Sequence, residues 1–422
     1  MTKFPLNNAA QWVEAFGSPL YVYDAKTIRG QYFRMKQAFD PTIDVGIHFA
    51  CKALNNLTVL RLMRRLGAGL DAVSLGEIEL GLRAGFRPDQ ILYTPNGVGI
   101  HEIKEAVEIG VQINIDNLET LEEFANEFGS TVPVCVRINP HIMAGGNTKI
   151  SVGHIDSKFG ISIHQIRHLH RIVHNMGLHV HGLHMHTGSD ILDIDAFMRG
   201  ADLLMDLAHD FKELAYIDFG SGFKVGYRPG ETATDIESFG EKMSVRFKEF
   251  CLEYGRDLKL IFEPGKFLVS EAGIFIAKVN STKTTPSTVF AQVNSGFNHF
   301  PRPMMYDAYH HIENLSHPHG ELRLYTIVGY VCETDTFGYD RKLNEVRNGD
   351  LLAFHNAGAY CSSMGSQYNS RVRPAEVLLE GDQPYLIRKR ETIDDLLRGT
   401  VEHGLYQDTL ELVREEAEIA VP

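Results

Sequence analysis

The sequence predicts an α/β protein that combines a (β/α)8 barrel of the TIM type with a second, mostly antiparallel β domain. Between Val45 and Glu263, eight short β-like runs alternate with amphipathic helical stretches, which is the layout of such a barrel. After Glu263 the helical signals become few, and strand-like segments are joined by Gly, Pro, Asn and Asp turns, as in an antiparallel sheet. The expected division is therefore a barrel at residues 26–268 and a β domain at residues 1–25 plus 269–422.

The hydrophobic pattern predicts the individual elements. Short runs rich in β-branched and aromatic residues predict strands, and longer runs with apolar residues three and four apart predict helices. The predicted barrel strands are Val45–Ala50, Gly69–Ala72, Ile91–Tyr93, Gln112–Ile115, Val134–Ile138, Val180–His186, Tyr216–Phe219 and Lys259–Glu263. The predicted helices are Ala25–Ala38, Leu57–Leu66, Leu75–Ala84, Ile100–Ile109, Leu118–Phe128, Ile163–Asn175, Asp193–His209 and Ile236–Tyr254. The predicted strands of the β domain are Leu20–Tyr23, Ile274–Val279, Thr288–Val293, Arg323–Val331, Asp350–Phe354, Ala375–Leu379 and Pro384–Arg390, with Gly296–Pro318 and Ala357–Arg373 as loops.

Charge and cysteine usage narrow the class of protein. The chain has 422 residues and a formal net charge of −13, which argues against nucleic acid or an anionic membrane surface as the main partner. Its five cysteines are scattered and show no CxxC spacing, so we expect neither a disulfide framework nor a zinc site. The amino terminus lacks an apolar run suited to a signal peptide, and no window reaches the length of a membrane span. These features predict a cytoplasmic protein.

Lys52 is the first candidate catalytic residue, because it directly follows the apolar strand Val45–Ala50 and Cys51. Burial of a lysine disfavours its charged form, so we expect a lowered pKa and an amine free to attack a carbonyl. The alternative is an ordinary surface lysine just past a strand end. Other polar residues follow further predicted strands, on the face where barrel active sites lie: Asp71, Thr94, Asp116, Arg137, His186, Gly220–Gly222 and Glu263.

Several motifs in order resemble the fold-type III pyridoxal-phosphate enzymes, and most closely the diaminopimelate decarboxylase family. The motifs in the first half of the barrel are FACKALN at Phe49–Asn55, GAGLDAVSLGE at Gly67–Glu77, RINPH at Arg137–His141 and SKFGI at Ser157–Ile161. The resemblance implies that pyridoxal 5'-phosphate is the cofactor, that Lys52 carries it and that Asp71 lies in its site.

Three glycine-containing motifs in the second half of the barrel extend the resemblance. In HMHTGSD at His184–Asp190, the spacing of His184 and His186 also suits a metal pair, but no third ligand accompanies them and we expect no metal. The resemblance instead implies that His186 stacks on the pyridine ring and that Ser189 contacts the phosphate. The other two motifs are DFGSGFKVG at Asp218–Gly226, which implies a phosphate contact for Gly222, and FEPGKF at Phe262–Phe267, which implies cofactor contacts for Glu263, Gly265 and Lys266.

The sequence departs from the family pattern at two of these positions. Ser221 stands where the family has the middle of three glycines, which reduces the backbone freedom of the turn. Lys266 stands where the family has arginine, and lysine keeps the charge but loses the bidentate fork. Glu263 keeps the family identity, and its carboxylate would hold the pyridine nitrogen protonated.

Motifs of the β domain imply the substrate site. In RPMMYDAYH, Arg302 and Tyr306 would bind the far carboxylate of the substrate. In VCETDTFG, Cys332 would donate a proton and Glu333 would hold the distal ammonium. Tyr360, in NAGAYCSSMGSQYNSRVRP, would reach phosphate and substrate, as would Lys266. A buried cysteine in core packing and a loop arginine in solvent are the alternatives.

The resemblance implies decarboxylation of meso-2,6-diaminopimelate to L-lysine by a homodimer with shared active sites, in which the partner lends the segment around Cys332. One alternative is a decarboxylase of another basic amino acid, such as ornithine or arginine, for which Arg302 would have no purpose. A second is an amino-acid racemase of the same fold. Such racemases resemble one another in placing an arginine at the ring nitrogen, and Glu263 at that place in this chain speaks against this alternative. The third is a non-catalytic pyridoxal-phosphate carrier, which resembles the barrel alone.

Overall fold

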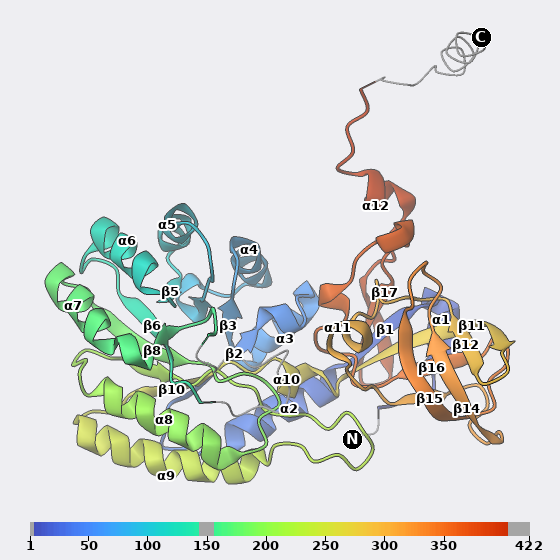
Figure 1. The fold of residues 1–422 in the computed structure, drawn as a ribbon, viewed down its shortest axis with the longest axis horizontal. Helices are drawn as coiled ribbons and strands as arrows, with labels where there is room; N and C mark the ends of the chain where they lie inside the picture. The colour runs from blue at the N-terminus through green and yellow to red at the C-terminus, as the bar shows by residue number, and fades with distance from the viewer. Residues whose placement is uncertain (1–3, 143–155, 404–422) are drawn as a thin grey trace.

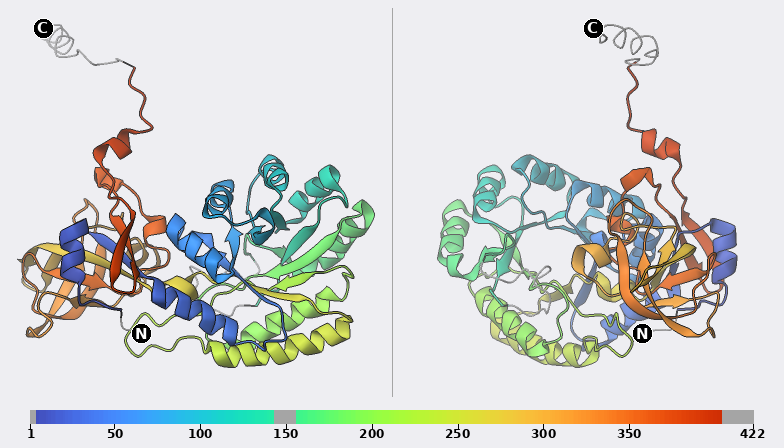
Figure 2. Two further views of the ribbon diagram at one scale, coloured as in Figure 1. Left: turned by 180° about the vertical axis from the view of Figure 1, so that it is seen from behind. Right: turned by 45° about the vertical axis from the view of Figure 1, so that its right-hand side comes forward.

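The computed structural model describes residues 4–142 and 156–403 and consists of a closed barrel beside a second sheet. In Figure 1 the barrel strands and the helices around them lie on one side, and the strands of the second sheet lie on the other. The rotated views in Figure 2 show the helices arranged as a ring outside the barrel strands. The fold class predicted from the sequence is confirmed.

Eight parallel strands close the barrel. They are β2 (Val45–Ala50), β3 (Gly69–Ala72), β4 (Ile91–Tyr93), β5 (Gln112–Ile115), β6 (Val134–Asn139), β8 (Val180–Met185), β9 (Tyr216–Asp218) and β10 (Lys259–Phe262). The closing pair is β10 with β2, in which Leu260 lies opposite Val45. A short strand, β7 (Ile161–Ser162), pairs with the end of β6. The apolar runs form strands because they are buried from both sides, and each predicted end differs from the observed one by at most one residue.

Helices cover the outside of the barrel. They are α2 (Ala25–Gln37), α3 (Leu57–Leu66), α4 (Leu75–Ala84), α5 (Ile100–Ile109), α6 (Leu118–Phe128), α7 (Ile166–Met176), α8 (Ile194–Ala208) and α9 (Ile236–Tyr254), followed by the short α10 (Lys266–Val269). Several begin at a side chain that accepts a backbone N–H, such as Asn56, Ser74 and Asp235. The predicted helix Ile163–Asn175 begins as a 3-10 turn before α7. No helix of the described ranges is long and apolar enough to cross a membrane.

The second sheet has β1 near its centre, between β11 and β17. Its strands are β1 (Leu20–Asp24), β11 (Gly273–Thr284), β12 (Val289–Val293), β13 (Ile312–Asn314), β14 (Leu322–Val328), β15 (Thr336–Asn344), β16 (Leu351–Phe354), β17 (Ala375–Glu380) and β18 (Gln383–Arg388). Three short helices accompany it: α1 (Ala9–Phe16), α11 (Arg302–Tyr306) and α12 (Ile393–Leu397). Most pairs are antiparallel, whereas β1 with β17 and β12 with β14 are parallel.

The prediction of a loop over Gly296–Pro318 is wrong in part, because the segment contains α11 and β13. The sequence prediction also missed β15, whose polar residues and glycine do not read as a strand. Pairing with β14 holds β15 in place, with Leu324 opposite Lys342. The predicted strand Arg323–Val331 ends early, at Val328.

A loop of the second sheet closes onto the start of the barrel. The backbone N–H of Tyr360 donates to the carbonyl of Ala53 at 2.8 Å, and the Ser363 hydroxyl donates to the carbonyl of Lys52 at 3.0 Å. Tyr360 has a positive φ of 56°, which turns the chain sharply at this contact. These bonds bring side chains of the second sheet to the carboxyl end of β2.

Candidate active site

The candidate site is a cavity of about 410 Å3 at the carboxyl ends of the barrel strands. All nine residues predicted to bind the cofactor line it: Lys52, Asp71, His186, Ser189, Gly222, Glu263, Gly265, Lys266 and Tyr360. They come from segments more than 300 residues apart in the chain, and only the closed barrel and the Tyr360 loop bring them together. The size suits a small organic ligand.

Lys52 forms an ion pair with Asp71 inside this cavity. Its Nζ lies 2.5 Å from Asp71 Oδ2, and Asp71 is only 1% exposed. Burial works to lower the pKa of Lys52, but Asp71, through its charge and its hydrogen bond, outweighs burial with the help of Tyr360 and Glu263, so the pKa is raised. The expectation of a lowered pKa is therefore wrong: the lysine side chain is 43% accessible within the cavity and faces a carboxylate from the neighbouring strand. Burial conversely raises the pKa of Asp71.

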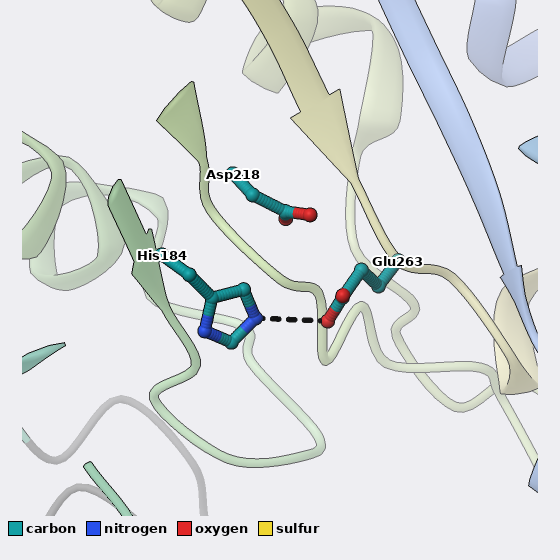
Figure 3. Close-up of side chains that lie close together, drawn as sticks. All are labelled: His184, Asp218 and Glu263. Carbon is teal, nitrogen blue, oxygen red and sulfur yellow. Dashed lines mark hydrogen bonds and ion pairs between the residues drawn. The ribbon is translucent and has the colours of Figure 1, made fainter. Parts of the chain in front are cut away.

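Glu263 directly follows β10, the strand paired with β2, and contacts His184 (Figure 3). Glu263 Oε2 and His184 Nε2 are 3.0 Å apart, and burial lowers the pKa of His184 well below its usual range, so its ring is neutral. Among the described residues, His184, Asp218 and Glu263 form the only group of three possible metal ligands, with their ligand atoms within 4.8 Å of one another. His186 is not part of this group. Its Nδ1 accepts a hydrogen bond from the backbone N–H of Ser221 at 3.2 Å.

The glycine turn after β9 approaches a second backbone segment closely. Gly222 has a φ of 129°, and a Cβ there would lie 2.1 Å from the carbonyl oxygen of Gly188, the residue before Ser189. The hydroxyl of Ser221 donates to the Glu263 carbonyl at 2.8 Å, so the serine that replaces a family glycine ties the turn to β10. The turn therefore exposes backbone close to Ser189, as a phosphate site requires.

Lys266 is buried and paired with an acidic neighbour. It is 7% exposed, and its Nζ lies 2.5 Å from Asp190 Oδ1. Burial lowers the pKa of Lys266, while the charge of Asp190 opposes that shift. Asp190 therefore favours the charged form of Lys266 at the cavity wall, where the family has arginine.

Arg302 and Tyr306 lie on α11, outside the set of residues that line the cavity. Arg302 is 8% exposed, so it is not a loop arginine in solvent. Its guanidinium lies 5.1 Å from the centre of the Tyr227 ring and 5.9 Å from that of Tyr306. Burial acts to lower the pKa of Arg302, but nearby acidic groups, Tyr227, Cys361, Asp190 and Tyr360 among them, raise it. Arg302 is therefore charged and acts on Tyr360, which lines the cavity, and on Asp190, which follows the lining residue Ser189.

Cys332 and Glu333 are exposed and do not line the cavity. Asn369 Nδ2 donates to Cys332 Sγ at 3.1 Å, and Tyr368 lies within bonding distance of both residues, at 3.6 Å from Cys332 Sγ and 2.8 Å from Glu333 Oε1. The hydrogen bonds from Tyr368 and Asn369 lower the pKa of the Cys332 thiol. Core packing does not explain this cysteine, because its side chain is in solvent.

The sequence prediction gave no role to several residues that line the cavity. Arg137 lies with its guanidinium 5.0 Å from the centre of the Phe159 ring, and both line the cavity. Asn96 lies nearby and donates to Asp116 at 2.7 Å. Arg137 and Phe159 belong to the motifs RINPH and SKFGI, so the sequence did indicate a role for them. Asn96 follows β4 in an ordinary turn, and no motif in the sequence indicated a role for it.

Comparison with known proteins agrees with this geometry. A family model described as "Pyridoxal-dependent decarboxylase, pyridoxal binding domain" matches residues 25–270. The diaminopimelate decarboxylase of Methanothermobacter thermautotrophicus is 40% identical over 93% of this chain and 94% of its own. The chain belongs to the diaminopimelate decarboxylase family.

Two further members of the family extend the match. The diaminopimelate decarboxylase of Escherichia coli K12 is 34% identical over 94% of this chain and 97% of its own. The crystal structure of the Helicobacter pylori diaminopimelate decarboxylase, complexed with L-lysine, is similar with a TM-score of 0.84 and 32% identity, covering 93% of this chain and 98% of that one. Because the likeness spans nearly the full length of both chains, it includes the barrel and the second sheet.

Proposed function

We propose that this chain is a pyridoxal-phosphate-dependent carboxy-lyase that converts meso-2,6-diaminopimelate to L-lysine and CO2, the last step of lysine biosynthesis. The observation that carries the proposal is the cavity, where a lysine amine, a buried carboxylate and a glycine-rich turn converge. The names of the relatives, and the L-lysine in the Helicobacter pylori enzyme, support the choice of substrate.

The residues around the cavity fit the cofactor. Glu263 Oε1 is buried and has no hydrogen-bond partner in the described part of the chain, which suits a protonated pyridine nitrogen. Ser189, Gly222 and Lys266 would hold the phosphate, and the neutral ring of His186 would lie on the cofactor ring. When bound, pyridoxal phosphate supplies a ring that accepts the electron pair left when CO2 departs.

Asp71 prepares Lys52 for covalent attachment. The lysine is charged in its ion pair, and only the neutral amine is a nucleophile. Because burial raises the pKa of Asp71, this carboxylate is a better proton acceptor than an ordinary aspartate. Asp71 Oδ2, which lies 2.5 Å from Lys52 Nζ, would be the group placed to accept the proton that the amine must lose on attachment.

The far end of the substrate is itself an amino-acid head group. Arg302 matches its carboxylate, helped by Tyr306, and Glu333 matches its ammonium. Lys266 and Tyr360 would contact the substrate nearer the cofactor. Ornithine and arginine lack a distal carboxylate, so they would offer no anion to the buried charge of Arg302, whose Nε donates to His310 at 3.3 Å, and an unneutralised buried charge is costly.

We further infer a homodimer in which the partner supplies Cys332 and Glu333. Two observations support it: both residues are exposed, and neither lines the cavity of its own chain. Cys332 would then return a proton to the substrate carbon after CO2 has left.

Mixing two inactive variants tests the shared site. Lys52→Ala and Cys332→Ala should each be nearly inactive, and subunit exchange should restore activity because one site in a mixed dimer keeps both groups. About half of the dimers are mixed, each with one working site, so recovery should approach roughly a quarter of the wild-type rate. If exchange is verified and no activity returns, Cys332 serves its own chain or is not the acid.

We also infer the division and the compartment of the protein. The barrel would occupy residues 26–268 and bind the cofactor, and residues 1–25 plus 269–422 would form the second domain. The pairing of β1 with β11 and β17 supports this division for the described residues. The five cysteines are all free, which supports a reducing, cytoplasmic location.

The proposed activity is tested by comparing substrates. Release of CO2 from meso-diaminopimelate, L-lysine, L-ornithine and L-arginine is measured with the loaded enzyme. We expect kcat/KM for meso-diaminopimelate to exceed that for each other substrate by a factor that corresponds to several kcal/mol, because a site built for a charged group rejects analogues that lack this group. A comparable kcat/KM for ornithine would overturn the proposal, and racemisation without CO2 release would point to a racemase.

A further inference from the structure

Asp218 is a buried acid to which the proposed mechanism gives no task. It ends β9, and strand register places it opposite His184 on β8, while its neighbour β10 leads into Glu263 (Figure 3). Asp218 is 0% exposed, and Glu263 is 8% exposed. Figure 3 shows the carboxyl group of Asp218 to one side of the contact between His184 and Glu263. We call His184, Asp218 and Glu263 the barrel-centre cluster.

Two carboxyl oxygens of the barrel-centre cluster have no hydrogen-bond partner among the described residues. Asp218 Oδ1 accepts the backbone N–H of Gly220 at 2.8 Å, and Glu263 Oε2 pairs with His184 Nε2 at 3.0 Å. Within the described ranges, Asp218 Oδ2 and Glu263 Oε1 have no such partner, and the two carboxyl groups approach to within 4.8 Å. Two ionised carboxylates only accept, so they repel each other at this distance. A single proton removes this repulsion and gives one of the two groups a hydroxyl that can donate to the other.

The charges around the cluster indicate which carboxyl keeps the proton. Lys52 is already paired with Asp71, and Arg137 is the remaining cation that acts on both Glu263 and Asp218. Burial, and then the charge of Glu263, raise the pKa of Asp218 well above its usual range. The titratable and charged groups that act on Asp218 or touch it are His184, Glu263, Asp71, Arg137, Cys135 and Tyr216.

The surrounding groups act differently on the pKa of Glu263. Burial raises its pKa above the usual value, and the charges of Lys52 and Arg137 and the neighbouring Asp218 carboxyl oppose that shift. Glu263 Oε2 lies 3.0 Å from Nε2 of the neutral His184, and in the tautomer that carries its proton on Nε2 the ring donates to Glu263 and favours the ionised carboxylate. Two cations, the His184 ring and one acid hydroxyl therefore support a single negative charge on Glu263.

We propose that Asp218 is a positioning residue that keeps its proton at neutral pH and donates it from Oδ2 to Glu263, so that Glu263 stays ionised. The consequence for the cofactor rests on the proposed function, in which Glu263 faces the pyridine nitrogen. The protonation of Asp218 does not rest on it, since it follows from the protein's own groups.

Asparagine and leucine separate this role from a structural one. Asp218→Asn keeps the acceptor for Gly220 and places an amide N–H where the hydroxyl donated, without charge. Asp218→Leu keeps the branching of the side chain, with a larger volume, but donates nothing. We therefore expect Asp218→Asn to keep cofactor affinity close to that of the wild type, and Asp218→Leu to lose about 10-fold or more.

Infrared difference spectroscopy of the cofactor-free protein reads the proton directly. The wild-type spectrum minus that of Asp218→Asn, at pH 7 to 8, should contain the C=O band of a protonated carboxyl group. The control is Asp206→Asn on α8, an exposed aspartate, whose difference spectrum should contain only carboxylate bands. A carboxylate band in place of the C=O band for Asp218 would overturn the proposal, as would equal loss of cofactor affinity in Asp218→Asn and Asp218→Leu.

A second measurement uses the wild-type protein alone, so that the proposal can still be tested if the Asp218 variants do not fold. Wild-type protein labelled with 13C at the aspartate carboxyl should retain an isotope-shifted C=O band of a protonated acid at pH 8, and its absence would reject the proposal. A clear protonated band in a protein that releases no CO2 from any candidate substrate would reject the proposed function alone. The two failures are therefore distinguishable.

Discussion

Replacing Gly222 by alanine should disrupt the cofactor site through a single added carbon. The new Cβ would lie 2.1 Å from the carbonyl oxygen of Gly188 and 2.8 Å from Cδ1 of Ile191. The first neighbour is backbone and cannot rotate away. The two segments are also tied together, since the Ile191 N–H donates to the Gly222 carbonyl at 2.9 Å. Alanine must therefore push the segment that carries Ser189 away from the turn.

The size of the effect follows from two contributions. An L-residue in the positive-φ region costs about 1–3 kcal/mol, and overpacking a close contact adds about 1–3 kcal/mol. Gly230→Ala is the matched control, because Gly230 also has a positive φ, 75°, but its Cβ would meet nothing within 4 Å. Gly222→Ala should therefore lower the free energy of unfolding by about 1–3 kcal/mol more than Gly230→Ala.

Two assays on the same preparations check this. Chemical denaturation gives the free energies of unfolding, and titration of cofactor-free protein with pyridoxal phosphate gives affinities. We expect Gly222→Ala to bind at least about 10-fold more weakly than the control, because displacement of Ser189 costs phosphate contacts. Equal stability and equal affinity for the two variants would refute the close approach of the two segments.

Three further predictions concern the proposed roles. Lys52→Ala should lose the absorption band of the covalently held cofactor while the fold, followed by circular dichroism, persists; retention of the band would reject Lys52 as the attachment site. Arg302→Lys should raise KM for meso-diaminopimelate by about 10-fold or more, because lysine loses the bidentate fork, and an unchanged KM would remove Arg302 from the substrate site. Tyr368→Phe should raise the pKa of Cys332, since a hydrogen bond that favours the thiolate is lost, and thus shift alkylation of this one exposed cysteine to higher pH; an unshifted profile would show that Tyr368 does not act on the thiol.

The barrel was predictable because its signals are local. A buried parallel strand such as β2 is a continuous apolar run, and helices such as α3 and α4 have their own caps and apolar faces. By contrast, β15 has a polar sequence and exists because β14 pairs with it. A strand that depends on its neighbour leaves a weak trace in its own sequence.

The contents of the site were predictable, but its electrostatics were not. The strand-end position of Lys52 was visible in the sequence, whereas its raised pKa depends on Asp71, which comes from the next strand. The barrel-centre cluster likewise depends on the register that sets His184 opposite Asp218. Register is a property of the assembled sheet, so pairs across strands cannot be inferred from spacing in one strand.

Identification of the product tests the central claim most directly. The loaded protein is incubated with meso-2,6-diaminopimelate, and lysine and CO2 are quantified together, with chiral analysis of the lysine. We expect L-lysine and CO2 in equal amounts from the wild type, and neither from Lys52→Ala. Absence of lysine, or formation of cadaverine from added L-lysine in preference to turnover of diaminopimelate, would contradict the proposed function.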